Sequence, residues 1–312
     1  MPPAVHWDEV EKERSDEGAF RSAWSVLGEA AGSVTVNVNR IEVEPGARST
    51  PLHMENAEEE IFFVLGGSGL SWQQNRGQPE QTFEIRPGDC LVHRAGAEAH
   101  SLVAGADGLD VLAFGDRSRA KLAFFPRLKG GRLGPLWTEE LPKHQWQMEL
   151  ELGEPELPPP SPRPPRIVNV DEVEAEEWSR GDSGGVDREL GAAAGSVRAG
   201  LNHSVVPAGT LNGPPHCHSA EEELFVVLDG TGTLLLGDEE HPVRRGSVVS
   251  RPAGTRVAHA FRGGDDGLTL LAYGTREAND ICYYPRSNKI YWRGVGLIAR
   301  LERLDYWDGE EG

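Results

Sequence analysis

The stretch Pro215-His216-Cys217-His218-Ser219-Ala220-Glu221-Glu222-Glu223 runs directly into the apolar segment Leu224-Phe225-Val226-Val227-Leu228-Asp229-Gly230. His216 and His218 are expected on one side of an extended strand, because strand side chains alternate with a period of two. Glu223 adds a carboxylate, and the apolar run after it predicts a buried strand that ends in a glycine turn. Two imidazoles and one carboxylate oxygen form a ligand set suited to Fe, Mn, Ni, Co or Zn.

A further histidine, His259, follows Pro252-Ala253-Gly254 and is a candidate fourth ligand. Glu223 is singled out from the acidic run before it by the apolar strand that follows and by its seven-residue distance from His216. Cys217 lies between the two histidines and is expected to point away from them, which favours a packing role over ligation.

The chain repeats itself. Residues 99–117 align without a gap on residues 258–276, and ten of the nineteen positions are identical. Glu58-Glu59-Glu60 aligns with Glu221-Glu222-Glu223, and Phe124-Phe125-Pro126-Arg127 with Tyr283-Tyr284-Pro285-Arg286. Self-similarity of this extent indicates a tandem duplication.

Between the halves, residues 151–165 contain seven prolines. Such a segment cannot form a helix interior or a central strand, and it favours an extended connector. We therefore expect an N-terminal domain over residues 1–150, a linker over 151–166 and a C-terminal domain over 167–312. Within each half, short apolar runs separated by Gly and Pro turns predict an all-β sandwich or barrel. Residues 174–178 are a candidate for one or two helical turns.

Composition excludes several classes of function. The chain has 312 residues and a net charge of −19, from 50 acidic and 31 basic residues, so nucleic acid is not an expected partner. No apolar run is long enough to span a membrane, and the N-terminus does not resemble a signal peptide. The three cysteines are too scattered for a disulfide framework, so a cytoplasmic location is expected. Phosphate loops, Gly-x-Ser-x-Gly elbows and Cys-x-x-Cys pairs are absent from the sequence.

The spacing from Gly209 through His216, His218 and Glu223 to Gly230, followed by Gly246, Pro252, Gly254 and His259, resembles the two signature motifs of the cupin superfamily. This resemblance covers most of the chain outside the linker and the C-terminal tail. It implies two tandem double-stranded β-helices, the jelly-roll barrels of a bicupin. The chain resembles uncharacterised bacterial bicupins. It also implies that His216, His218, Glu223 and His259 bind a metal, unless the barrel has kept the motif only for folding.

In the N-terminal half the aligned positions are His53, Glu55, Glu60 and His100. Glu55 replaces one histidine. It either coordinates, giving a harder ligand set that favours Mn or Fe, or turns outward and leaves a vestigial site. We expect this second site to be the weaker one. His93 is an additional histidine nearby, expected to have an ordinary partner.

Cupins catalyse many reactions, so the resemblance does not choose one. The leading hypothesis is a metal-dependent enzyme acting on a small organic substrate in the barrel pocket, with a divalent transition metal (Fe, Mn, Ni or Zn) as cofactor. A dioxygenase-like oxidoreductase would use Fe(II), whereas a decarboxylase or isomerase would use Mn, Ni or Zn. The alternative is a cupin that binds or senses a small molecule without catalysis. The family is also compatible with a homodimer.

Two further features are open to interpretation. The aligned pairs Arg40/His203 and Asn39/Asn202 either line the barrel mouth or lie outside the barrel. The aromatic-Pro-Arg segments either close one barrel end or pack between the domains.

Overall fold

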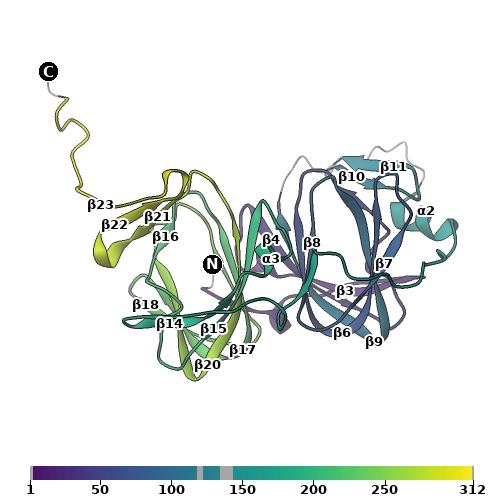
Figure 1. Ribbon diagram of the computed structural model, residues 1–312, viewed down its shortest axis with the longest axis horizontal. Coiled ribbons are helices and arrows are strands. Elements are labelled where there is room, and N and C mark those ends of the chain that lie inside the picture. The colour runs from purple at the N-terminus through teal and green to yellow at the C-terminus, as the bar shows by residue number, and fades with distance from the viewer. Residues whose placement is uncertain (1–2, 118–121, 134–142, 311–312) are drawn as a thin grey trace.

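The computed structural model describes residues 3–117, 122–133 and 143–310, and it contains two β-barrels side by side (Figure 1). The first barrel is one sheet with the strand order β12-β8-β6-β9-β4-β3-β2, with β7 paired to β6. Its strands are β2 (Glu13–Glu17), β3 (Phe20–Val26), β4 (Val36–Val43), β6 (Glu60–Asn75), β7 (Gln81–Ile85), β8 (Asp89–His93), β9 (Glu98–Asp116) and β12 (Ile167–Asn169).

The second barrel repeats this arrangement with the order β1-β19-β17-β20-β15-β14-β13, and β18 pairs with β17. Its strands are β1 (Val5–His6), β13 (Glu176–Arg180), β14 (Ser183–Arg188), β15 (Ala199–Val206), β17 (Glu223–Leu236), β18 (Glu239–Arg244), β19 (Ser247–Arg251) and β20 (His259–Thr275). All pairings within the two large sheets are antiparallel, and the all-β jelly-roll class predicted from the sequence is confirmed.

A small sheet covers one end of each barrel. In the first barrel it consists of β5 (Met54–Glu55), β10 (Leu122–Phe125) and β11 (Gly130–Leu133). In the second it consists of β16 (Cys217–His218), β21 (Ile281–Tyr284), β22 (Lys289–Trp292) and β23 (Leu297–Arg300). The aromatic-Pro-Arg segments therefore belong to barrel ends and not to the interface between the barrels.

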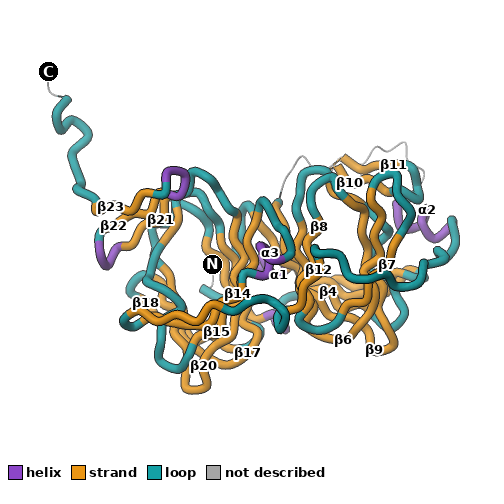
Figure 2. Tube along the Cα trace, viewed as in Figure 1, coloured by secondary structure: helices purple, strands orange, loops and turns teal. Residues whose placement is uncertain are grey.

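Helix is scarce in the described part of the chain (Figure 2). The α-helices are α1 (Leu27–Ala30), α2 (Gln145–Glu151) and α3 (Leu190–Ala193), and none of them is long and apolar enough to cross a membrane. The helical turn predicted over residues 174–178 is wrong, because Glu176–Arg180 forms the edge strand β13. Pairing of this strand with β14 outweighs the local helix propensity of its alanine and glutamates.

Two short strands cross the predicted domain bounds. β1, at the start of the chain, pairs with β19 of the second barrel, and β12, directly after the linker, pairs with β8 of the first barrel. Each barrel thus receives one edge strand from the segment that precedes the other barrel. This reciprocal exchange ties the two halves together through backbone hydrogen bonds.

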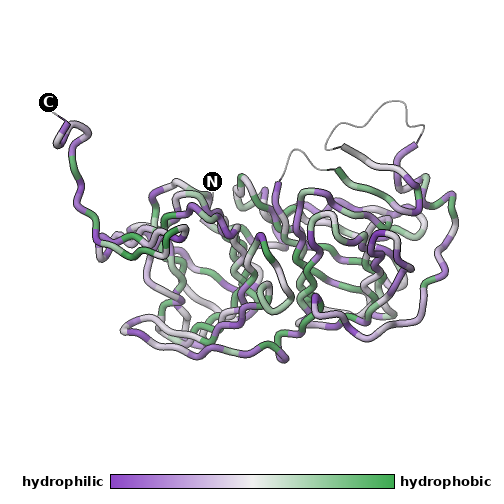
Figure 3. The backbone as a smooth tube through the Cα atoms, turned by 45° about the horizontal axis from the view of Figure 1, so that its top comes forward, coloured by the Kyte–Doolittle hydropathy of each residue, from purple (hydrophilic) through white to green (hydrophobic). Residues whose placement is uncertain are grey.

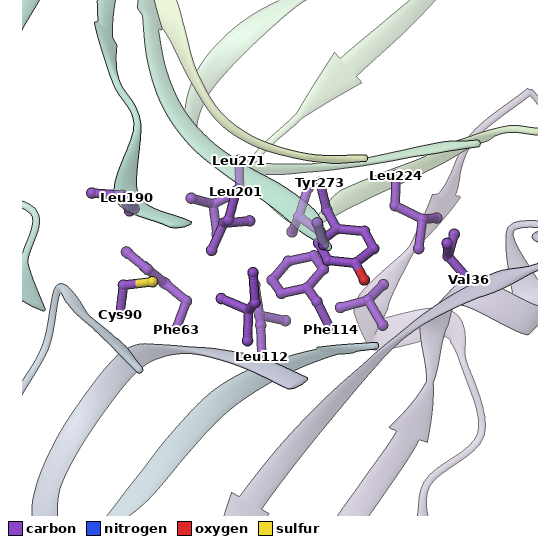
Figure 4. Close-up of a cluster of buried hydrophobic side chains, with 14 of the residues drawn as sticks. Val36, Phe63, Cys90, Leu112, Phe114, Leu190, Leu201, Leu224, Leu271 and Tyr273 are labelled. Atoms are coloured by element: carbon purple, nitrogen blue, oxygen red, sulfur yellow. The ribbon is translucent and has the colours of Figure 1, made fainter. Parts of the chain in front are cut away.

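The largest apolar core lies between the barrels (Figure 4). On β17, Leu224 and Val226 face this shared core, whereas Phe225 and Val227 fill the interior of their own barrel. Both faces of the strand are buried, which explains why its sequence is continuously apolar instead of alternating. Along the backbone, apolar residues are concentrated in these barrel strands (Figure 3).

Candidate metal centre

The four candidate ligands of the second barrel come together at one end of it. His218 lies on β16, Glu223 and His259 are the first residues of β17 and β20, and His216 precedes β16. Oε2 of Glu223 lies 3.2 Å from Nε2 of His218 and 3.0 Å from Nε2 of His259. The His216 ring centroid lies 4.8 Å from that of His259 and 5.0 Å from that of His218.

The atoms that face one another in this cluster lack hydrogen-bond partners. Nε2 of His218, Nε2 of His259 and Oε2 of Glu223 are buried and make no hydrogen bond with any residue in the described part of the chain. A buried polar atom without a partner costs about 1–3 kcal/mol. A cation held among these atoms would remove that cost, since all three are electron-pair donors. The donor set therefore fits a metal ion.

The Nδ1 atoms of His216 and His218 are held by hydrogen bonds on the side of each ring away from the cluster. Nδ1 of His216 donates to the carbonyl oxygen of Pro214 at 2.9 Å, and Nδ1 of His218 donates to the carboxylate of Asp280 at 2.7 Å. These bonds hold each ring with Nε2 directed into the cluster, which is the usual way in which an outer partner selects the ligand nitrogen.

The pKa values of His216, His218 and Glu223 are shifted in different directions. Burial lowers the pKa of His216 to about 4, so its imidazole is neutral at pH 7. Burial also opposes the charged form of His218, but its hydrogen bond to Asp280 and the nearby carboxylate of Glu223 raise its pKa to about 10. Although burial opposes ionisation of Glu223, the neighbouring His259 and His218 hold its pKa well below the usual range. The cluster thus contains a carboxylate, and a proton that a metal would have to displace.

Asp280 was not identified from the sequence. Its side chain is buried, and Oδ1 accepts hydrogen bonds from the backbone N–H groups of Ser219, Ala220 and Glu221. The sequence contained one signal: the aligned position in the first half is Lys121, which lies outside the described residues. The first repeat thus has Lys121 at the position of Asp280, and Glu55 at the position of His218.

A cleft of about 1150 Å³ reaches the site from outside and is lined in part by His216, Glu223 and Phe225. Its other lining residues include a group of acidic side chains: Glu172, Glu174, Glu176, Glu177, Asp187 and Glu189. Glu172 is paired with Arg86, and Asp187 accepts a hydrogen bond from Trp178. A cleft with this lining concentrates positive charge and repels anions.

The first barrel forms a similar but incomplete cluster. Nε2 of His100 lies 3.0 Å from Oε2 of Glu60, and the His53 and His100 ring centroids are 4.9 Å apart. Nδ1 of His53 donates to the carbonyl oxygen of Pro51 at 3.0 Å, as in the second barrel. His53, Glu60 and His100 have potential ligand atoms within 4.8 Å of one another, as do His216, Glu223 and His259 in the second barrel. Neither group includes the remaining candidate, Glu55 or His218.

Burial lowers the pKa values of His53 and His100, so both rings favour the neutral form. Their cavity is small, about 140 Å³. His93 stacks on His100 with ring centroids 4.0 Å apart, and its Nδ1 lies 3.3 Å from the buried carboxylate of Glu98. Glu98 also pairs with Arg166 from the linker. His93 therefore has the ordinary partner expected from the sequence.

The structure resolves the two features left open by the sequence. Arg40 points away from the pocket, since it pairs with Asp110 and lies over the Trp7 ring. Asn39 and Asn202 are among the residues that line the barrel cavities. Neighbouring strand positions face opposite sides of a sheet. In each barrel the asparagine therefore faces the cavity, and the adjacent residue, Arg40 or His203, faces outward.

The aromatic-Pro-Arg segments close the barrel ends that carry the histidine clusters. The Tyr284 ring centroid lies 5.7 Å from that of His216, and the Phe125 centroid lies 6.0 Å from that of His53. Each segment thus places an aromatic ring beside the first histidine of its motif.

Comparison with known proteins agrees with this architecture. The sequence family described as Cupin domain matches twice, over residues 39–113 and 202–272, which are corresponding parts of the two barrels. The chain is a bicupin of the cupin superfamily. No curated protein gives a significant match to the sequence of this bicupin.

Solved structures similar to this bicupin include oxalate decarboxylases. The Bacillus subtilis enzyme at pH 4.6 is 15% identical, with a TM-score of 0.59 over 87% of this chain and 75% of that chain. A formate complex of the Lactobacillus farciminis enzyme is 15% identical, with a TM-score of 0.60 over 88% and 86%. A B. subtilis structure used to study Mn(II) centres is 14% identical, with a TM-score of 0.61 over 89% and 78%. At this level of identity the likeness establishes the fold.

Proposed function

We propose that this bicupin is a metal-dependent enzyme whose reaction takes place in the second barrel. The observation that carries the proposal is the convergence of buried, unpartnered Nε2 and Oε2 atoms from His218, Glu223 and His259. Such an arrangement is costly without a cation, and His216 completes a set of three imidazoles and one carboxylate. The ligands expected from the resemblance are thus the residues that we propose to hold a divalent transition metal.

Bound there, the metal would supply Lewis acidity or redox chemistry to a substrate in the cleft. The side chains have separate tasks. Asp280 orients His218, and the Pro214 carbonyl orients His216. Tyr284 and Phe225 place aromatic surface beside the ligands and limit the access of water.

The charge of the cleft bears on the substrate. Glu174, Glu176, Glu177 and Glu189 line it, and no lysine or arginine is among its lining residues in the described part of the chain. The structural neighbours act on oxalate, which carries two negative charges at neutral pH. An acidic cleft disfavours such a dianion, so we propose a neutral or cationic small organic substrate instead. Manganese remains compatible with the ligand set, as do iron, nickel and zinc.

The test begins with metal analysis of the purified full-length protein. Protein loaded with Fe(II) or Mn(II) is then incubated separately with phenols, amines and dicarboxylates, while O₂ consumption and substrate loss are followed. Turnover of a neutral or cationic compound that requires the metal supports the proposal. Metal binding and saturable ligand binding without turnover would instead favour the non-catalytic binding protein. Turnover of oxalate alone would overturn the proposed substrate class.

A further inference from the structure

A thiol lies beside the proposed metal ligands of the second barrel and has no part in the function proposed above. Cys282 is on β21, directly opposite His218 of β16 in the antiparallel register. Residues paired in this way have side chains on the same face of the sheet. The Cys282 side chain is buried, with 4% of its surface exposed.

Distances connect this thiol to the cluster. The Cys282 sulfur and one nitrogen each from His216 and His218 all lie within 4.8 Å of one another. Metal–sulfur and metal–nitrogen bonds are about 2.3 and 2.1 Å long, so two such ligands of a tetrahedral ion lie about 3.6 Å apart. Side-chain shifts of up to about 1 Å therefore bring the sulfur within bonding range. His218 is itself one of the proposed ligands, and its side chain is 8% exposed.

The other cysteines have different surroundings. Cys90 is part of the apolar core between the barrels, and Cys217 pairs with Tyr283, so its side chain faces away from that of Cys282. In the first barrel the position equivalent to Cys282 is Ala123, which pairs with Glu55. Sulfur is thus available to the second site and not to the first.

We propose that Cys282 is a sulfur ligand of the metal in the second barrel and makes this site prefer thiophilic ions. The inference rests on the proposed metal site. When the ion binds, the S–H proton leaves to solvent and the thiolate electron pair forms the metal–sulfur bond. Zn²⁺ and Co²⁺ accept thiolate readily, whereas Mn²⁺ prefers oxygen ligands. The two barrels would then differ in metal preference. The second barrel would offer nitrogen, oxygen and sulfur donors, and the first only nitrogen and oxygen donors.

Cobalt(II) reports on this ligand directly. Full-length protein carrying His53→Ala, which disables the first site, is freed of metal and titrated with Co²⁺. We expect visible d–d bands and, in addition, a sulfur-to-cobalt charge-transfer band in the near ultraviolet. Cys282→Ala, which reproduces the residue of the first barrel, loses the charge-transfer band and keeps the d–d bands. Cys217→Ala keeps both and is the matched control.

Each alternative outcome identifies what has failed. Cobalt bound with d–d bands, but without a charge-transfer band before Cys282 is changed, would overturn the sulfur ligand and leave the proposed site intact. A charge-transfer band that survives Cys282→Ala would overturn it as well. No cobalt uptake by protein with an intact second site would overturn the proposed metal site itself. Cys282→Ser, nearly equal in size to cysteine, replaces the alanine variant if circular dichroism shows that the latter is unfolded.

Discussion

The carboxylates of Glu59 and Glu222, which occupy the same position in the two repeats, cross the boundary between the barrels in opposite directions. Glu222 accepts hydrogen bonds from the backbone N–H groups of Val34 and Thr35 at 2.8 and 2.6 Å. Glu59 accepts from the backbone N–H groups of residues 197–199 at 3.1 to 3.2 Å. Both glutamates are buried. Each barrel thus supplies a carboxylate that accepts hydrogen bonds from backbone N–H groups at the start of a strand in the other barrel.

Glu222→Ala should therefore lower the free energy of unfolding by about 1–3 kcal/mol, because the backbone N–H groups of Val34 and Thr35 lose their carboxylate acceptor. Chemical denaturation monitored by circular dichroism measures the change. Glu84→Ala, on an exposed position of β7, is the control and should change stability by no more than about 0.5 kcal/mol. An equal effect of the two substitutions would contradict the structural role of Glu222.

The sequence predicted the barrels and the candidate ligands because both repeat with a fixed spacing. It did not predict Glu222, because the acidic run gives no indication of which barrel each carboxylate faces. The edge strands β1 and β12 were also missed, since two or three residues are too few to show a periodic pattern. Pairing partners at such ends are chosen by tertiary packing and not by local propensity.

Asp280 and Cys282 were missed for a related reason. Both lie some sixty residues after His218 and become its neighbours only when β21 pairs with β16. Neither has an identical residue in the first repeat, so neither belongs to the shared pattern from which the candidate ligands were identified.

Asp280→Asn should weaken metal binding at the second site about 10–100-fold. The amide would present an N–H group to Nδ1 of His218, which favours the tautomer with the hydrogen on Nε2, the nitrogen needed by the metal. Competition with a chromophoric chelator measures the affinity. Asp182→Asn, at an exposed carboxylate paired with Arg286, should leave it unchanged. Equal affinities of the two variants would exclude a positioning role for Asp280.

In the Cys282→Ala variant, where no thiol proton is released, metal affinity at the second site should rise about tenfold per pH unit from about pH 7 until the pKa of His218 is passed. The pKa of His218 is raised to about 10, so the metal-free ring is protonated at neutral pH and the metal must displace that proton. His216, with a pKa lowered to about 4, adds no dependence in this range. Titration with Zn²⁺ in noncoordinating buffers measures the slope, and a flat profile above pH 7 would contradict the protonation state of His218.

The two barrels should differ in occupancy. The second site has three histidines and Glu223, whereas the first barrel has Glu55 at the position of one of these histidines, His218. Each missing ligand removes one bond and part of the fixed geometry, so the first site should hold a transition metal less tightly. Elemental analysis should find that His216→Ala removes most of the bound metal and that His53→Ala removes little. The same contrast should appear in catalytic turnover, because the acidic cleft opens onto the second site and the first-barrel cavity is only about 140 Å³. Loss of metal in His53→Ala, with retention in His216→Ala, would assign the metal centre to the first barrel.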